Sequence, residues 1–162
     1  ANSRESNAGK RGEAILQQMQ SLYKSGDVDA KPGTTTYNAV ISAWAKSRDS
    51  NAGKRAEAIL QQMQSLYQSG NVDVKPDTTT YNAVISAWAS SRDTNAGRQA
   101  EAILRQMKAL YQAGDVDVKP NTTTYSASIS AWGNSHHPER VARAEALLKE
   151  MNNLHRAVVF VM

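Results

Sequence analysis

The sequence T-T-T-Y-N-A-V-I-S-A-W-A at residues 78–89 decides how the whole chain is organised. It occurs unchanged at residues 34–45, and it returns as T-T-T-Y-S-A-S-I-S-A-W-G at residues 122–133. The copies are spaced by 44 residues, and four methionines keep the same step: Met19, Met63, Met107 and Met151. A fixed period in this range is typical of solenoid proteins, in which each copy is one supersecondary unit.

Each copy of this stretch has the apolar spacing of a helix with one buried face. Its apolar residues follow the pattern i, i+3, i+4 and i+7 and are, in the first copy, Tyr37, Val40, Ile41 and Trp44. A polar turn at residues 47–51 leads to a second stripe, formed by Ala56, Ile59, Leu60, Met63, Leu66 and Tyr67. The pair Ser69-Gly70 then ends the second helix, because glycine takes the left-handed conformation without a Cβ penalty. Each unit is therefore predicted to be a helical hairpin, and an extended connector follows it.

The repeat pattern makes the whole chain one all-α array and divides it into units. Residues 1–33 form a trailing half-unit, residues 34–77 and 78–121 are complete units, and residues 122–156 are the last unit. We predict a right-handed α-solenoid of seven helices, in which one trailing helix is followed by three antiparallel pairs. The apolar residues 157–162 match no copy and could fold over the end of the solenoid, begin another domain or be a cloning artefact.

The first residue aligns with the middle of a unit, since Ala1 is equivalent to Ala45. We therefore expect the chain to be a piece of a longer protein, with any targeting segment outside it. The two complete units differ at ten positions, and none of the ten is apolar in the first unit. The packing face is thus constant while the surface varies, as stacking requires.

Composition narrows the classes of function only a little. The formal net charge is +4, and each unit carries one more basic than acidic residue, a mild bias that is compatible with a polyanionic partner. The chain has no cysteine, which excludes disulfides and thiolate metal sites. No apolar run reaches the roughly 18 residues that a membrane span needs, so no membrane span is expected.

The order K-P-D-T-T-T-Y-N-A-V-I-S-A-W-A at residues 75–89, followed by A-E-A-I-L-R-Q-M at 100–107, resembles the pentatricopeptide repeat family. The resemblance implies an α-solenoid, similar to tetratricopeptide arrays, that binds single-stranded RNA in mitochondria or chloroplasts. Units of that family run to about 35 residues, so the resemblance is to an elongated variant. The additional residues fit in the turn at 90–97 and the connector at 111–118, where insertions cost little.

The resemblance also implies which residues select bases: the one after the leading tyrosine and the one after the proline that closes the unit. These are Asn38 with Asp77 and Asn82 with Asn121, whereas Ser126 has no closing partner in the chain. The family's pairing rules imply that the first unit prefers uracil and the second cytosine. The chemistry agrees, because a carboxylate accepts the N3–H of uracil and an amide donates to the bare N3 of cytosine.

Two further contacts follow from the resemblance. Thr35, Thr79 and Thr123 match an aliphatic position that sandwiches the base, and threonine offers less apolar surface, so stacking should be weaker. Lys46 matches a lysine that contacts the RNA backbone, and its place is taken by Ser90 and Asn134 in the later units.

Structural roles are alternatives for most of these residues. Asn38 and Asn82 could hydrogen-bond to the backbone near a helix start, and Asp77 and Asn121 could be plain N-caps. The aromatic residues of the leading helices are predicted to pack in the core rather than stack on bases: Tyr37, Tyr81, Tyr125, Trp44, Trp88 and Trp132. The adjacent His136-His137 pair has no carboxylate cluster or cysteine with it, so a solvated turn is predicted there rather than a metal site.

Two functions from different classes remain. The first is sequence-selective binding of single-stranded RNA, which supports organelle RNA processing, stability or translation. The second is a protein-binding or structural solenoid within a large organelle assembly. An enzyme is not expected, because catalytic machinery would not recur identically in every unit, and no cofactor is expected. A polar groove would favour the RNA-binding function, and an apolar groove would favour the binding of a peptide.

Overall fold

The computed structural model describes residues 7–160, except the side chains of residues 155 and 157–160. This part of the chain contains no strand. Its seven α-helices are α2 (Ala8–Lys24), α3 (Thr34–Ser47), α4 (Ala52–Gln68), α5 (Thr78–Ser91), α6 (Ala96–Gln112), α7 (Thr122–Asn134) and α8 (Arg140–Phe160). The predicted all-α fold with seven helices is confirmed.

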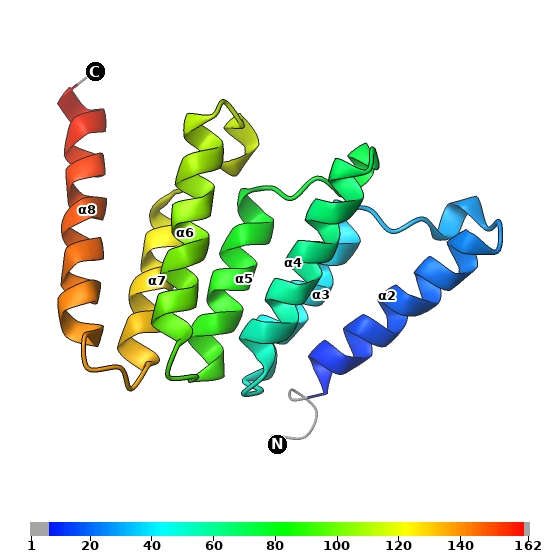
Figure 1. Cartoon of the computed structure of the whole chain (residues 1–162), viewed down its shortest axis with the longest axis horizontal. Coiled ribbons are helices and arrows are strands. Elements are labelled where there is room, and N and C mark those ends of the chain that lie inside the picture. The colour runs from blue at the N-terminus through cyan, green and yellow to red at the C-terminus, as the bar shows by residue number, and fades with distance from the viewer. Residues whose placement is uncertain (1–6, 161–162) are drawn as a thin grey trace.

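The helices form two layers, which are visible in Figure 1. The leading helices α3, α5 and α7 pack directly against one another in a row. Each interior trailing helix packs against two leading helices: α4 against α3 and α5, and α6 against α5 and α7. The end helices α2 and α8 pack against α3 and α7, respectively. This is the predicted stack of helical hairpins.

The core is built from the repeated apolar residues. The tyrosine and tryptophan of each leading helix are all buried: Tyr37, Tyr81, Tyr125, Trp44, Trp88 and Trp132. Their predicted packing role is therefore confirmed.

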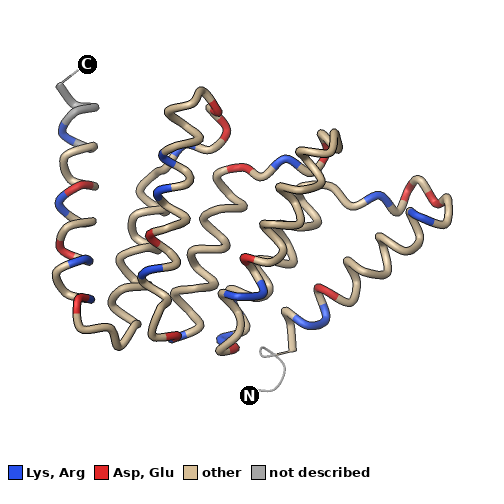
Figure 2. Tube along the Cα trace, viewed as in Figure 1, with Lys and Arg blue, Asp and Glu red and all other residues tan. Residues whose placement is uncertain are grey.

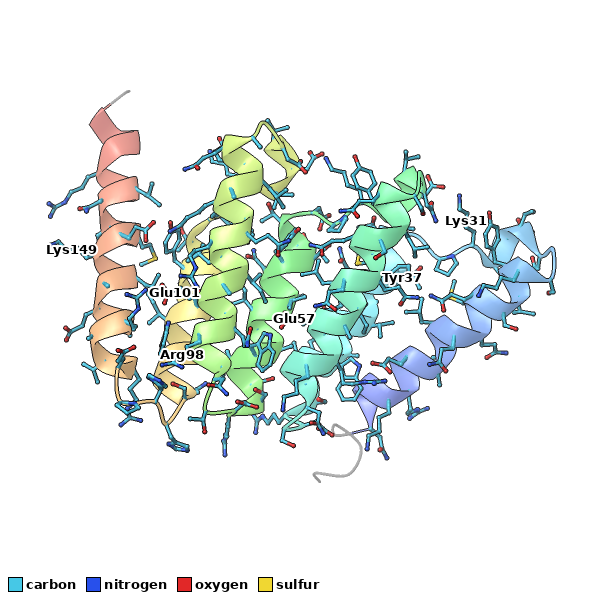
Figure 3. The ribbon with its side chains drawn as sticks, viewed as in Figure 1. Lys31, Tyr37, Glu57, Arg98, Glu101 and Lys149 are labelled. Carbon is cyan, nitrogen blue, oxygen red and sulfur yellow. The ribbon has the colours of Figure 1, made fainter. Side chains whose placement is uncertain are left out.

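A glycine and a glutamate on each of the trailing helices α2, α4 and α6 hold the tryptophan of the next unit. A Cβ at Gly53 would lie 2.3 Å from Cδ2 of Trp88, so only glycine lets α4 approach the indole ring this closely. The indole Nε1 of Trp88 donates to Glu57, one turn along α4, at 3.0 Å. The same arrangement recurs at both neighbouring junctions, with Glu13 and Trp44 at 2.8 Å and Glu101 and Trp132 at 2.9 Å. In Figure 3, Glu57 and Glu101 mark two of these junctions.

The predicted apolar stripe of the trailing helices is wrong for its last tyrosine. Tyr67 and its equivalents Tyr23 and Tyr111 are each 39% exposed. Their rings lie beside a lysine of the connector that follows, as in Tyr67, where the Nζ of Lys75 is 5.9 Å from the ring centroid. The tyrosine covers the connector instead of entering the core.

At the two ends of the array, the equivalent stripe is only partly buried. In the interior, Ile59 and Leu60 are both buried, whereas only one residue of the equivalent pair is buried in α2 and in α8. Ile15 is 58% exposed beside buried Leu16, and Leu148 is 45% exposed beside buried Leu147. The isoleucine position therefore faces the leading helix of its own unit, which α2 lacks in the described residues. The leucine position faces the leading helix of the next unit, and the described residues contain no such helix after α8.

The connectors begin as predicted but are not fully extended. Gly70 ends α4 with a φ of 100°, and Gly26 and Gly114 do the same for α2 and α6. Each connector then makes one 3-10 turn: η1 (Val28–Ala30), η2 (Val72–Val74) and η3 (Val116–Val118). Val74 and Val118 of these turns are buried, which explains the turn, because an extended connector would leave those valines in solvent.

Lysines of the connectors link consecutive units. The Nζ of Lys75 lies 2.8 Å from Asp117 and 2.9 Å from Asp115 in the next connector. These hydrogen bonds raise the pKa of Lys75 above its usual value, so its ammonium group stays charged across the physiological range. Lys31 pairs in the same way with Asp73.

The last helix, α8, runs to Phe160 and so includes residues 157–160 of the segment that matches no repeat copy. Residues 161–162 of that segment lie outside the described residues. Across the described helices, none has the combination of length and apolar composition that would let it span a bilayer.

The start of α3 gives a stability prediction. Asp77 and Asn121 cap α5 and α7, whereas Gly33 precedes α3 without a side-chain cap. Gly33 has a φ of −112°, which any residue can adopt, and a Cβ there would meet only the Asp73 carbonyl oxygen at 3.5 Å. We expect Gly33→Asn to raise the free energy of unfolding in urea by about 0.5–1 kcal/mol. An unchanged or lower stability would contradict this role for the cap.

Candidate nucleic-acid interface

The structure brings together both pairs of residues that the sequence singled out. Asn38 lies in the second turn of α3, and its Nδ2 is 3.3 Å from Oδ1 of Asp77, at the start of α5. Asn82 and Asn121 repeat the arrangement between α5 and α7, also at 3.3 Å. The members of each pair are 39 residues apart and meet because consecutive leading helices pack side by side.

The second member of each pair is held by a capping box. The Oδ1 atom of Asp77 accepts a hydrogen bond from the backbone N–H of Thr80 at 2.9 Å, and the Asp77 N–H donates to the Thr80 hydroxyl at 3.0 Å. Asn121 and Thr124 do the same at 3.1 and 3.0 Å. The N-cap interpretation is therefore confirmed, and it fixes one oxygen of each side chain.

The first member of each pair is oriented by the same threonine. The buried Thr80 hydroxyl lies 2.7 Å from Oδ1 of Asn38, and Thr124 lies 2.6 Å from Oδ1 of Asn82. Each asparagine thus bonds to side chains of the next unit rather than to the backbone. Sequence reasoning missed these threonines, although the D-x-x-T order of a capping box was a readable signal.

One atom of each capping side chain stays open. Oδ2 of Asp77 and Nδ2 of Asn121 have no hydrogen-bond partner in the part of the chain that the structure describes. Asp77 is half-buried and Asn121 is exposed. The first pair therefore presents an acceptor to an incoming group, and the second presents a donor.

The other predicted residues lie on the same side of the leading helices. Thr35, Asn38, Ser42 and Lys46 of α3 are spaced by three or four residues and share one face. We call this face, with its equivalents on α5 and α7, the leading-helix surface. Thr35, Thr79, Thr123, Ser126 and Lys46 are all exposed on it.

This surface is polar and almost free of charge. Figure 2 shows the charged residues on the trailing helices, turns and connectors, while α5 and α7 carry none. A groove of about 440 Å³ crosses α5 and α7 towards their C-terminal ends. It is lined by two alanines and by Arg48, Ser86, Ser90, Arg92, Ser130 and Asn134. The groove has no carboxylate in its lining and is polar rather than apolar, the property expected for RNA.

The histidine pair is placed apart from these groups. The ring of His137 meets Trp132 edge-on, with 5.6 Å between centroids, and His136 is exposed. Across the described residues, no three histidine, cysteine, aspartate or glutamate side chains gather as a metal site would require.

Part of the chain matches a known family. Residues 66–135 match the pentatricopeptide repeat domain, a segment that runs from the end of α4 to just beyond α7. It contains Asp77, Asn82 and Asn121 of the two polar pairs. A comparison with curated proteins returns no match.

Proposed function

Since residues 66–135 match the pentatricopeptide repeat domain, we propose that the chain binds single-stranded RNA along the leading-helix surface and selects one base with each complete unit. The repeats of this family are generally non-catalytic binding modules. The observation that carries the proposal is the pair of open atoms, an acceptor on Asp77 and a donor on Asn121, held in the same place in consecutive units.

The two capping side chains differ in a single atom, and that atom matches a difference between two bases. The free Oδ2 of Asp77 can accept the N3–H of uracil, whereas the free Nδ2 of Asn121 can donate to the N3 of cytosine. Because the cap uses only Oδ1 in both cases, either residue can stand at the position without disturbing the helix that follows.

The remaining residues of the surface have supporting roles in this proposal. The methyl groups of Thr35 and Thr79 pack on the base, and Lys46 faces the RNA backbone. Stacking contributes about 1–3 kcal/mol per base, so the two complete units of this chain bind RNA weakly and at low salt. A role in RNA processing, stability or translation in a mitochondrion or chloroplast is part of the proposal and rests on the family alone.

The test is the substitution Asp77→Asn, read out by fluorescence anisotropy on two RNA oligomers that differ only by uracil or cytosine at one site. We expect the preference at the first base to move from uracil towards cytosine by about tenfold, the value of one such hydrogen bond. The melting temperature should change little, because Asn121 forms the same capping box at the start of α7.

The reciprocal substitution Asn121→Asp is the matched control, and it should move the second base from cytosine towards uracil. An equal loss of affinity for both oligomers would refute base selection by this pair. Failure of the wild-type chain to bind either oligomer at low salt would instead favour a protein-binding or structural solenoid.

A further inference from the structure

Two arginines stand in a backbone conformation that normally belongs to glycine. Arg48 follows α3 with a φ of 53°, and Arg92 follows α5 with a φ of 56°. They are the only non-glycine residues with positive φ in the described part of the chain. This conformation costs an L-residue roughly 1–2 kcal/mol, and glycine is the usual choice just after a helix. Arginine at a strained position in both complete units indicates a role for its side chain.

Both arginines line the groove of the leading-helix surface, and no acidic residue lines it with them. Within residues 7–160, neither arginine forms an ion pair, although an aspartate follows each of them. Those aspartates are engaged elsewhere: Asp49 accepts from the backbone of Asn51, and Asp93 accepts from Asn95 and pairs with a lysine of α4. Each groove cation is therefore open to an anion from outside.

We propose that Arg48 and Arg92 bind successive phosphate groups of the RNA backbone, an inference that rests on the proposed function. The planar guanidinium fork matches two phosphate oxygens. One arginine per complete unit also matches one nucleotide per unit. The groove places Arg48 and Arg92 beside Ser90 and Asn134, the two residues that replace the lysine of the first unit, so the arginines supply the cations where those lysines are missing.

The arginines form a row separate from the base-selecting pairs. Ser90 lies eight residues beyond Asn82 on α5, which is about 12 Å along the helix axis. The polar pairs that distinguish bases therefore lie along one edge of the surface, and the arginines that bind phosphates lie along the other edge.

The test is the double variant Arg48→Gly/Arg92→Gly, because glycine removes the charge and also relieves the left-handed backbone. Its melting temperature should be equal to or higher than that of the wild type. The slope of log affinity against log salt should fall in magnitude by about 1.4, because each contact with single-stranded RNA contributes about 0.7. If the variant and the wild type bind equally at 1 M salt, this change in slope makes the variant bind about 25-fold more weakly than the wild type at 0.1 M salt. The uracil and cytosine oligomers should lose affinity equally.

The matched control is Arg98→Gln/Arg105→Gln, which removes two exposed arginines from the trailing helix α6, where Arg98 is labelled in Figure 3. It lowers the net charge equally and should leave the salt slope unchanged. The inference would be overturned if the wild-type chain discriminates the oligomers but the glycine variant has the same salt slope as the wild type. That result would leave the proposed function standing. An equal fall of the slope in the control would also overturn it. A wild-type chain that binds neither oligomer would remove both.

Discussion

Replacing Gly53 with alanine is expected to destabilise the protein by about 3 kcal/mol, although it adds a single methyl group. The new Cβ would lie 2.3 Å from Cδ2 and from Cε3 of Trp88, closer than any real contact. Trp88 cannot move aside, because its ring is buried and its Nε1 is held by Glu57 at 3.0 Å. The helices of the two units must therefore separate. Urea denaturation followed by circular dichroism measures the loss.

The control is a second Gly→Ala substitution that is expected to change the stability in the opposite direction. A Cβ at Gly133 of α7 meets nothing within 4 Å, and Ala45 and Ala89 already occupy the equivalent places. Gly133→Ala should raise stability by about 0.5–1 kcal/mol, since alanine is the better helix former. A double-mutant cycle with Trp88→Leu should show strong coupling to Gly53→Ala. Wild-type stability in Gly53→Ala would disprove the close approach.

The sequence predicted the helices and their pairing well, because apolar spacing and a fixed period report on both. It did not reveal the role of Gly53. The N-A-G order suggests a turn, and the contact with Trp88 arises only when two units stack. The presence of this glycine in each of the first three trailing helices, together with a glutamate four residues later, was the available signal.

The candidate site was predictable only in part, and for a physical reason. Residues 39 positions apart, such as Asn38 and Asp77, give no local sign that they meet, and their pairing came from the family resemblance. The orienting hydroxyl of Thr80 depends on the same inter-unit packing. The left-handed backbone of Arg92 was not visible either, because the position does not carry the glycine that usually marks this conformation after a helix.

Truncating one isoleucine to alanine should cost very different amounts at two positions with the same local sequence. I-L-Q-Q-M occurs at residues 15–19 and again at 59–63. Ile59 is 5% exposed and Ile15 is 58% exposed. We expect Ile59→Ala to cost about 3 kcal/mol and Ile15→Ala about 0.5 kcal/mol, because only the interior side chain leaves a cavity. Urea denaturation of the two variants gives the comparison.

The leucine position should show the same contrast at the other end of the array. Leu104 is fully buried between α6 and α7, whereas Leu148 is 45% exposed, so Leu104→Ala should be the costly substitution of that pair. Since helix propensity is unchanged within each comparison, the difference in stability measures the contribution of the covering leading helix. If Ile15→Ala cost as much as Ile59→Ala, the exposed face of α2 would have to be covered in solution. Self-association would then appear as a concentration-dependent sedimentation coefficient, and a monomeric protein with equal costs would contradict the two-faced arrangement of the trailing helices.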